Sequence, residues 1–262
     1  MSSLRNYRNE RTPCHQIKSW KTPRLYCFSN PLKLAYFYLL EWSPNVIDFW
    51  ESCPLLPLEQ TLAIAESCGL PHPTNPKTGH PTVMTTDFVQ SIRNGHRTPY
   101  VPASVKSLAE LQNPRSLGEL EIERRYWAAR KTCSTLITEN DLCPRLIENI
   151  AWVHPYRDRN DFTDLDELPL SLLASILINA LKEGTESLRS ITRYYDRYMD
   201  FPRGTSLAVI RHLLANRVIR INMQKPINMD EPLTLQYSKA TKENDSEEDE
   251  NDYSTAKLQQ IS

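Results

Sequence analysis

The stretch Thr82–Lys106, TVMTTDFVQSIRNGHRTPYVPASVK, predicts a β-hairpin. Two strand-like runs flank the turn residues Asn94-Gly95, a pair that favours tight hairpin turns. Reflecting the strands about the turn centred on Asn94 to Arg97 puts Asp87 opposite Ser104, and Lys106, two residues on, shares the face of Ser104. The hairpin therefore predicts an acid and a lysine on one face of a two-stranded ribbon.

This layout is that of nucleases of the PD-(D/E)xK type, in which the Asp holds a divalent metal and the Lys orients or activates the attacking water. Pro99 and Pro102 lie in the return strand, where a proline-induced bulge would shift the register by one or two residues. A surface ion pair is the other interpretation of the same Asp and Lys.

The residues around the hairpin predict alternating helices and strands. Asn30 and Pro31 form an N-cap and a first helical position before an apolar face. Further helices are expected over 60–68, 115–130 and 146–153, and strands over 46–49, 82–89, 100–105 and 134–138. We therefore expect one α/β domain over residues 30–155.

A second domain is expected after a polar linker at 156–167. Three helical patterns (168–183, 186–199 and 205–216) and two strand-like runs (218–223 and 232–237) predict a mostly α winged-helix domain over 168–240. On its third helix Arg211, His212 and Arg217 would point outward, with Arg220 on the wing. Solvated charges on a small helical domain are the alternative, and a winged-helix transcription regulator would explain this C-terminal pattern alone.

The formal net charge is -1, from 31 Lys+Arg and 32 Asp+Glu, which taken alone argues against nucleic-acid binding. The charges are segregated, however. Residues 1–29 form a basic arm, either a DNA-contacting segment or a solvated one. Residues 241–262 form an acidic tail that we expect to be disordered. The neutral sum therefore does not exclude DNA as a ligand.

Other classes are excluded by composition. Six glycines leave no glycine-rich phosphate loop, and the six cysteines lack CxxC pairing, which favours free thiols in a reducing compartment. The longest apolar stretch, 168–181, is too short to cross a bilayer. These features predict a protein with no membrane partner.

Several blocks of sequence stand in a fixed order: Leu40-Glu41-Trp42, CPLLP at 53–57, VMTTDF at 83–88, Val105-Lys106, EIERRYW at 121–127 and ENIAW at 148–152. In this order and spacing the chain resembles the TnsA family, the endonuclease subunits of heteromeric, cut-and-paste bacterial transposases. The resemblance covers about residues 30–153, and the winged-helix expectation agrees with the family's second domain.

The resemblance implies a restriction-endonuclease-like (PD-(D/E)xK) fold that nicks the 5′ ends of the transposon with Mg²⁺ or Mn²⁺. It also implies three partners: transposon-end DNA, a sister transposase subunit that cuts the 3′ ends, and an ATP-dependent transposition regulator. The implied location is the bacterial cytoplasm, in association with the nucleoid.

Carried over by position, Asp87 resembles the family's metal-binding aspartate and Lys106 its catalytic lysine. Ser104 occupies the second position of the motif, where this family commonly has Gln. Glu123 falls on a further acidic position, although we interpret it as an exposed helix charge. The basic residues assigned to DNA contact are Arg124, Arg125, Arg211, Arg217 and Arg220.

Lys33 is the main departure from the family pattern. The family's first metal-binding Glu lies eight residues before the Glu of the Leu-Glu-Trp block, and that position is Lys33 here. The third helical position also favours Glu through the capping box and the helix dipole. Three explanations stay open: an inactive or attenuated subunit kept for assembly, an engineered or sporadic substitution in an active enzyme, or another acid in the role. The candidate acids are Glu41, Glu119, Glu121 and Glu123.

Overall fold

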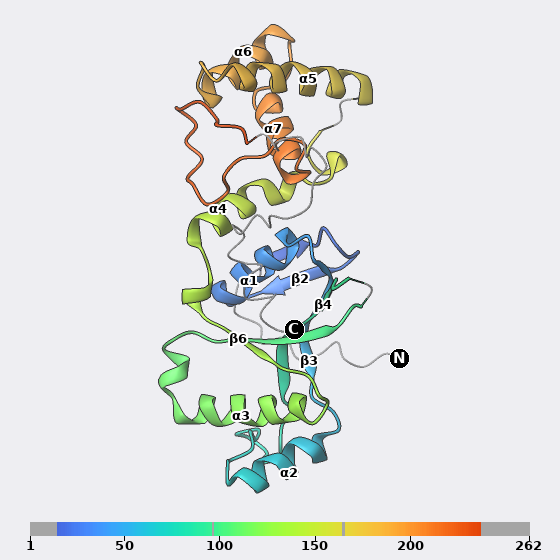
Figure 1. Ribbon diagram of the computed structural model, residues 1–262, viewed down its shortest axis with the longest axis vertical. Helices are drawn as coiled ribbons and strands as arrows, with labels where there is room; N and C mark the ends of the chain where they lie inside the picture. The colour runs from blue at the N-terminus through green and yellow to red at the C-terminus, as the bar shows by residue number, and fades with distance from the viewer. Residues whose placement is uncertain (1–14, 96, 164–165, 237–262) are drawn as a thin grey trace, which may run out of the picture. The chain divides into compact units, whose positions relative to one another are not determined.

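The computed structural model describes residues 15–95, 97–163 and 166–236. It divides the chain into two compact units, of which the first ends at Leu142 and the second begins at Cys143 (Figure 1). The first 14 residues of the expected arm and the acidic tail expected over 241–262 lie outside the described residues.

A four-stranded sheet forms the centre of the first unit. Its strands are β3 (Val46–Pro54), β4 (Thr85–Ile92), β5 (Tyr100–Val105) and β6 (Thr135–Ile137), in the order β3-β4-β5-β6. The first two pairings are antiparallel, while β5 and β6 are parallel and need a crossover. Helix α3 (Pro114–Ala128) lies within that crossover, so the expected α/β class is confirmed.

The hairpin register agrees with the sequence prediction. Phe88 pairs with Ala103 and Val89 with Pro102, without a register shift along the described β4–β5 pair. Continuing this register by one residue places Ser104 opposite Asp87. The prolines of β5 therefore do not displace the acid from its expected position.

Helix α1 (Pro31–Trp42) begins as its sequence predicts. The side chain of Asn30 accepts hydrogen bonds from the amides of Leu32 (2.8 Å) and Lys33 (3.3 Å), and Pro31 occupies the first turn. The helix packs by Phe37, which is fully buried. Its ring lies 5.7 Å from that of Phe49 on β3, so α1 has a fixed start and a fixed face on the sheet.

Residues 15–28 are an ordered hairpin rather than an irregular arm, because their aromatic side chains enter the core. Strands β1 (His15–Lys18) and β2 (Leu25–Phe28) pair antiparallel, and Tyr26 and Phe28 are only 3% and 4% exposed. Glu41 of α1 holds the connecting loop by accepting from Ser19 Oγ at 2.5 Å and from Trp20 N at 2.6 Å. The arm prediction is wrong for this segment.

Helix α2 (Leu58–Cys68) packs against α3 through a small apolar cluster. The buried members of this cluster come from α2, from α3 and from segments next to them, and are Leu55, Ala65, Met84, Ile122 and Tyr126. Short 3₁₀ helices η1 (Glu110–Gln112) and η2 (Glu139–Asp141) lie in the connections. The cluster fixes α3 against the strands that carry the candidate site.

The second unit is helical. It contains α4 (Pro144–Val153), the 3₁₀ turns η3 (His154–Tyr156) and η4 (Arg159–Asp161), then α5 (Glu167–Glu183), α6 (Leu188–Tyr198) and α7 (Thr205–Ala215). Helix α4 packs against α7, which differs from the domain boundary expected at 155. Asn149 explains the difference, because its amide donates to the carbonyls of Met223 (2.8 Å) and Lys225 (2.7 Å).

The three C-terminal helices match their expected positions, but no wing is found among the described residues after them. Within 218–236 the described chain has no β-strand, and the one backbone bond across the segment runs from Gln236 N to Arg220 O (2.7 Å). Asn222 and Asn228 instead accept from backbone amides two residues on, which closes local turns. The two strands were therefore predicted wrongly over the described residues, and a winged helix is not confirmed.

Two further expectations concern cysteines and membranes. Cys27 is disulfide-bonded, so the expectation of free thiols is wrong there, whereas Cys53, Cys68, Cys133 and Cys143 are free. Among the described helices none is long and apolar enough to cross a membrane.

Candidate active site

Asp87 on β4 is the centre of the candidate site. It is 7% exposed, and its Oδ2 accepts from the backbone amide of Val105 at 2.8 Å and from Lys106 Nζ at 3.2 Å. Its Oδ1 lies 2.5 Å from Lys33 Nζ. A single buried carboxylate is therefore contacted by two ammonium groups and one amide, so its negative charge is fully compensated.

Both lysines are positioned by the ends of secondary-structure elements, Lys33 by the start of α1 and Lys106 by the ends of β5 and β6. Lys33 stands in the first turn of α1, which the Asn30 cap fixes. Lys106 follows β5 directly, and its backbone amide donates to Ile137 O of β6 at 3.0 Å. The structure thus brings together three of the residues singled out from the sequence, Lys33, Asp87 and Lys106.

Glu123 of α3 is a second buried carboxyl group at the site. It is 5% exposed, so our interpretation of it as an exposed helix charge is wrong. Burial raises its pKa, the hydroxyls of Ser104 and Thr86 lower it, the charge of Asp87 raises it further and Lys106 lowers it. Glu123 Oε1 has no hydrogen-bond partner among the described residues. The pKa of Glu123 is therefore raised, with burial as the main cause.

The other candidate acids are engaged elsewhere. Glu41 holds the β1–β2 loop, as described above. Glu119 pairs with Arg115 at 3.1 Å. Glu121 accepts from Arg124 (2.7 Å) and Arg125 (2.6 Å), and these hydrogen bonds lower its pKa to about 2. Of the four acids considered, Glu123 alone lies at Asp87. The same contacts occupy two arginines that we had assigned to DNA.

The residues present do not fit a bound Mg²⁺ or Mn²⁺. Such ions are held by carboxylates and other oxygen ligands in near-octahedral geometry. Here two ammonium groups cover the carboxylate of Asp87, and burial raises the pKa of Glu123, which disfavours its charged form. The described part of the chain also contains no group of three or more His, Cys, Asp or Glu residues arranged to hold a metal. Lys33 supplies positive charge where a metal ion would have to approach.

Comparison with known proteins identifies the chain. A family model for the N-terminal domain of TnsA-like endonucleases matches residues 43–139, and one for the C-terminal domain of TnsA endonuclease matches residues 142–223. The chain is 35% identical over 214 residues to the transposon Tn7 transposition protein TnsA of Escherichia coli, covering 80% of this chain and 74% of the relative. The chain belongs to the TnsA endonuclease family. The two family models meet at the division between its compact units.

In the second unit of this TnsA family member, the predicted DNA-contacting residues have different surroundings. Arg211 does not point outward, because its Nη1 donates to the Tyr156 hydroxyl at 2.7 Å and its guanidinium lies 4.1 Å from the ring centroid of Trp152. His212 Nδ1 lies 2.8 Å from the carbonyl oxygen of Tyr156, so it too differs from the outward position expected. The expected arginine surface on α7 is therefore largely occupied.

The last two predicted contacts follow α7. Arg217 is half-buried and has a left-handed backbone, with φ of 57°. Arg220 is exposed, but it lies in an irregular segment instead of on a wing. A DNA-contacting role for these two residues stays a prediction.

Proposed function

We propose that this chain is the DNA-end subunit of a TnsA-type heteromeric transposase, in which Lys33 attenuates cleavage of the transposon 5′ ends. The single observation that carries the proposal is the 2.5 Å contact between Lys33 Nζ and Asp87 Oδ1. Membership of the TnsA endonuclease family supports the transposase role, and the contact supports the attenuation.

The physical argument is competition for one carboxylate. A divalent ion would have to displace the Lys33 ammonium from Asp87 and then remain near its charge. Two unit charges about 4 Å apart interact by about 4 kcal/mol at an effective dielectric constant near 20. Partial exposure of the lysine reduces this severalfold, yet a residual ~1.4 kcal/mol still corresponds to a tenfold effect. Lys33 thus opposes the metal-dependent reaction without preventing folding or DNA binding.

The partners follow from the family. The Escherichia coli relative is named a transposition protein of transposon Tn7. For this chain we propose transposon-end DNA, a sister transposase subunit and an ATP-dependent regulator as partners. In this role the two units bind the DNA ends and the transposase, while the sister subunit performs strand cleavage at the 3′ ends.

A second candidate function is a fully active endonuclease that nicks the 5′ ends with Mg²⁺ or Mn²⁺. The contact between Asp87 and Lys106 and the adjacent Glu123 favour it, because an acid and a lysine on one ribbon face suit phosphodiester hydrolysis. This candidate requires Lys33 to leave Asp87 when DNA binds.

A nicking assay distinguishes the two candidates. It uses the full chain with the partner transposase, supercoiled DNA carrying transposon ends, and either Mg²⁺ or Mn²⁺. We expect slow nicking by the wild type and a gain of about tenfold or more for Lys33→Glu, which replaces the opposing charge by a ligand. Lys77→Glu, the same charge change at an exposed position of the first unit, is the matched control and should leave the rate unchanged.

Two outcomes contradict the proposal. Wild-type nicking as fast as that of Lys33→Glu would favour the second candidate. If Asp87→Ala in the Lys33→Glu background leaves the gained activity intact, Asp87 is not part of the reacting site.

A further inference from the structure

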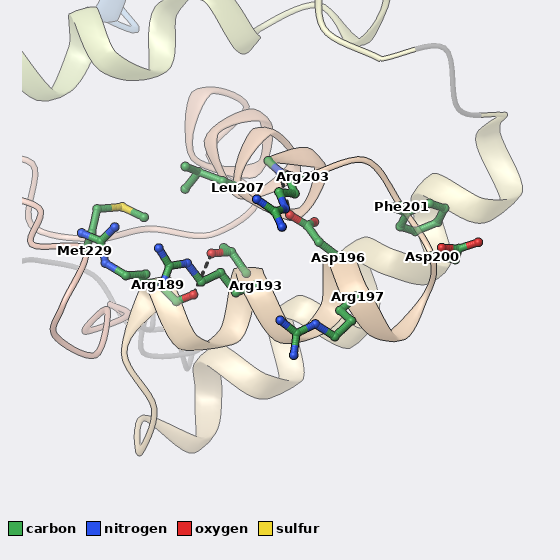
Figure 2. Close-up of a pocket in the computed structure, with 11 residues that line it drawn as sticks. Arg189, Arg193, Asp196, Arg197, Asp200, Phe201, Arg203, Leu207 and Met229 are labelled. Atoms are coloured by element: carbon green, nitrogen blue, oxygen red, sulfur yellow. Dashed lines mark hydrogen bonds between the residues drawn. The ribbon is translucent and has the colours of Figure 1, made fainter.

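A pocket of about 620 Å³ opens on the second unit beside α6 and the loop that leads into α7 (Figure 2). Four arginines line it: Arg189, Arg193 and Arg197 from α6, and Arg203 from the loop. The three helical arginines are spaced four residues apart and therefore project from one side of α6. The sequence analysis assigned none of them a role.

The arginines differ in how their charges are compensated. Arg189 is anchored by Asp230, with contacts of 2.5 and 3.2 Å. Arg193, Arg197 and Arg203 are exposed, and no hydrogen bond or ion pair joins their side chains to any residue that the structure describes. Three cations therefore surround the pocket without a partner of their own.

The acids of the pocket do not cancel this charge. Asp196 is buried, and its two oxygens accept from Gly204 N at 2.6 Å and Ser206 N at 2.7 Å, at the start of α7. Its charge is thus used to cap a helix N-terminus, where an anion is favoured. Asp200 is the second acid in the lining, and Asp230 pairs with Arg189 beside it, so four arginines stand against three acids.

Two tyrosines are exposed on a neighbouring side of α6. Tyr194 and Tyr198 are 58% and 71% exposed, and their rings stack on each other with centroids 5.7 Å apart. Each follows an arginine of the pocket directly in sequence, so the tyrosine row lies about 100° around α6 from the arginine row. Arginine guanidinium and tyrosine hydroxyl groups are among the usual donors to phosphate oxygens of DNA.

We infer that this arginine surface, formed by Arg193, Arg197 and Arg203 around the pocket, binds the phosphodiester backbone of duplex DNA. Positions 189 to 197 extend over about 12 Å of helix. Duplex DNA carries one negative charge per ~1.7 Å of its axis, so several phosphates lie within reach of such a row. Contacts of this kind position a protein on DNA without reading its sequence.

This inference rests on the proposed binding of transposon-end DNA, but it is tested by affinity instead of cleavage. Fluorescence anisotropy with a labelled duplex measures binding of the full chain between 50 and 200 mM salt. Each lost phosphate contact lowers the slope of log affinity against log salt by about 0.9. For the triple variant Arg193→Gln, Arg197→Gln and Arg203→Gln we expect a slope smaller by about 2.7. Raising the salt from 50 to 200 mM should therefore weaken DNA binding by the variant about 40-fold less than it weakens binding by the wild type.

The matched control removes three charges elsewhere in the same unit. Arg145→Gln, Lys182→Gln and Lys225→Gln change exposed residues outside the pocket and should leave most of the slope in place. A triple Arg→Lys variant at 193, 197 and 203 keeps the charge, so it should retain the slope if phosphates are the ligand. Thermal denaturation of each variant verifies that the second unit is folded.

Three results would overturn the inference. The first is an unchanged slope in the folded triple Gln variant. The second is thermal stabilisation of the wild type by inorganic phosphate combined with that unchanged slope, which would make the pocket a site for free anions. The third concerns polyglutamate. If the triple Gln variant loses the polyglutamate binding of the wild type but keeps its DNA binding, the surface belongs to an acidic polypeptide. Failure of the wild type to bind any duplex would contradict the proposed function itself.

Discussion

Two groups of cationic side chains in this chain differ in whether a carboxylate pairs with them. In the first unit, Lys33 and Lys106 converge on the buried carboxylate of Asp87 and neutralise it. In the second unit, Arg193, Arg197 and Arg203 surround a pocket whose buried acid is already used to cap α7. The first group is paired with a carboxylate and is proposed to oppose a metal ion, whereas the second is exposed and is proposed to bind a phosphate backbone. The partner of a cation, and not its charge alone, therefore decides what it can do.

The largest stability effect should come from the compensated group. Asp87→Ala leaves two lysines facing each other without their carboxylate and strips the Val105 amide of its acceptor. Breaking a buried pair costs about 3–5 kcal/mol, and partial exposure of the lysines reduces this to about 2 kcal/mol here. Urea denaturation followed by tryptophan fluorescence measures the change. Glu119→Ala, which breaks an exposed pair with Arg115, is the control and should cost less than about 0.5 kcal/mol.

Asp196→Ala should produce the next largest loss, because it uncaps α7 and leaves two amides without their acceptor. Losing a cap costs about 1 kcal/mol, and burial of the freed amides raises the expected loss to about 1.5 kcal/mol. Thermal denaturation followed by circular dichroism reports it. Asp200→Asn, at an exposed position of the same pocket, removes the same charge at a left-handed backbone position that asparagine tolerates, so it should be nearly neutral. An equal loss there would contradict the capping role.

Glu123 gives a smaller, pH-dependent effect. Burial raises its pKa in the folded chain, so its contribution to stability is full below about 4.5, its ordinary value, and is lost as pH rises through the folded pKa. Glu123→Gln cannot ionise and should flatten this fall. From pH 4.5 upward, the Tm of Glu123→Gln should therefore rise progressively relative to the Tm of the wild type. A difference independent of pH would contradict the raised pKa.

The smallest stability effect should come from the unpaired group. Arg197→Gln removes a side chain with no described partner, so the free energy of unfolding should change by less than about 0.5 kcal/mol. The slope of DNA affinity against salt should fall by about 0.9 in the same protein. If Arg197→Gln loses stability but keeps its slope of DNA affinity against salt, Arg197 supports the fold and does not contact DNA, which would contradict its place in the second group.

The sequence predicted the hairpin and its chemistry because both depend on local rules. The turn at Asn94-Gly95 and the two-residue period of a strand were enough to place Asp87, Ser104 and Lys106 on one face. The helix start at Asn30 likewise follows from a cap that acts within three residues. Such features need no knowledge of the rest of the chain.

Features that depend on tertiary packing were missed. Glu123 reads as one more charge in a charged helix, and its burial depends on α3 lying against the strands that carry Thr86 and Ser104. A signal was present, because the neighbouring Ile122 and Tyr126 are spaced four residues apart on an apolar face. The hairpin at 15–28 was missed for the same reason, since the burial of Tyr26 and Phe28 outweighs the basic composition around them.

The second unit shows the reverse error, in which a familiar pattern was assigned too readily. Three helices followed by two β-prone runs suggested a wing, but the Asn222 and Asn228 turns satisfy the backbone locally instead. Arg211 of α7, and Arg217 and Arg220 after it, were then chosen as DNA contacts on the basis of that fold. The structure places the exposed arginines of the pocket earlier in the chain, with Arg193 and Arg197 on α6 and Arg203 in the loop that follows it.

The Asn30 cap has a genetic consequence. Because Asn30 and Pro31 set the start of α1, the third helical position faces Asp87 whichever side chain it carries. Codons for lysine and glutamate differ only in their first base. One base substitution therefore exchanges a cation for a carboxylate at that position, while the Asn30 cap that starts α1 is unchanged. We expect selection for more frequent transposition to recover revertants at this codon, which would make residue 33 a heritable control on how often the element moves.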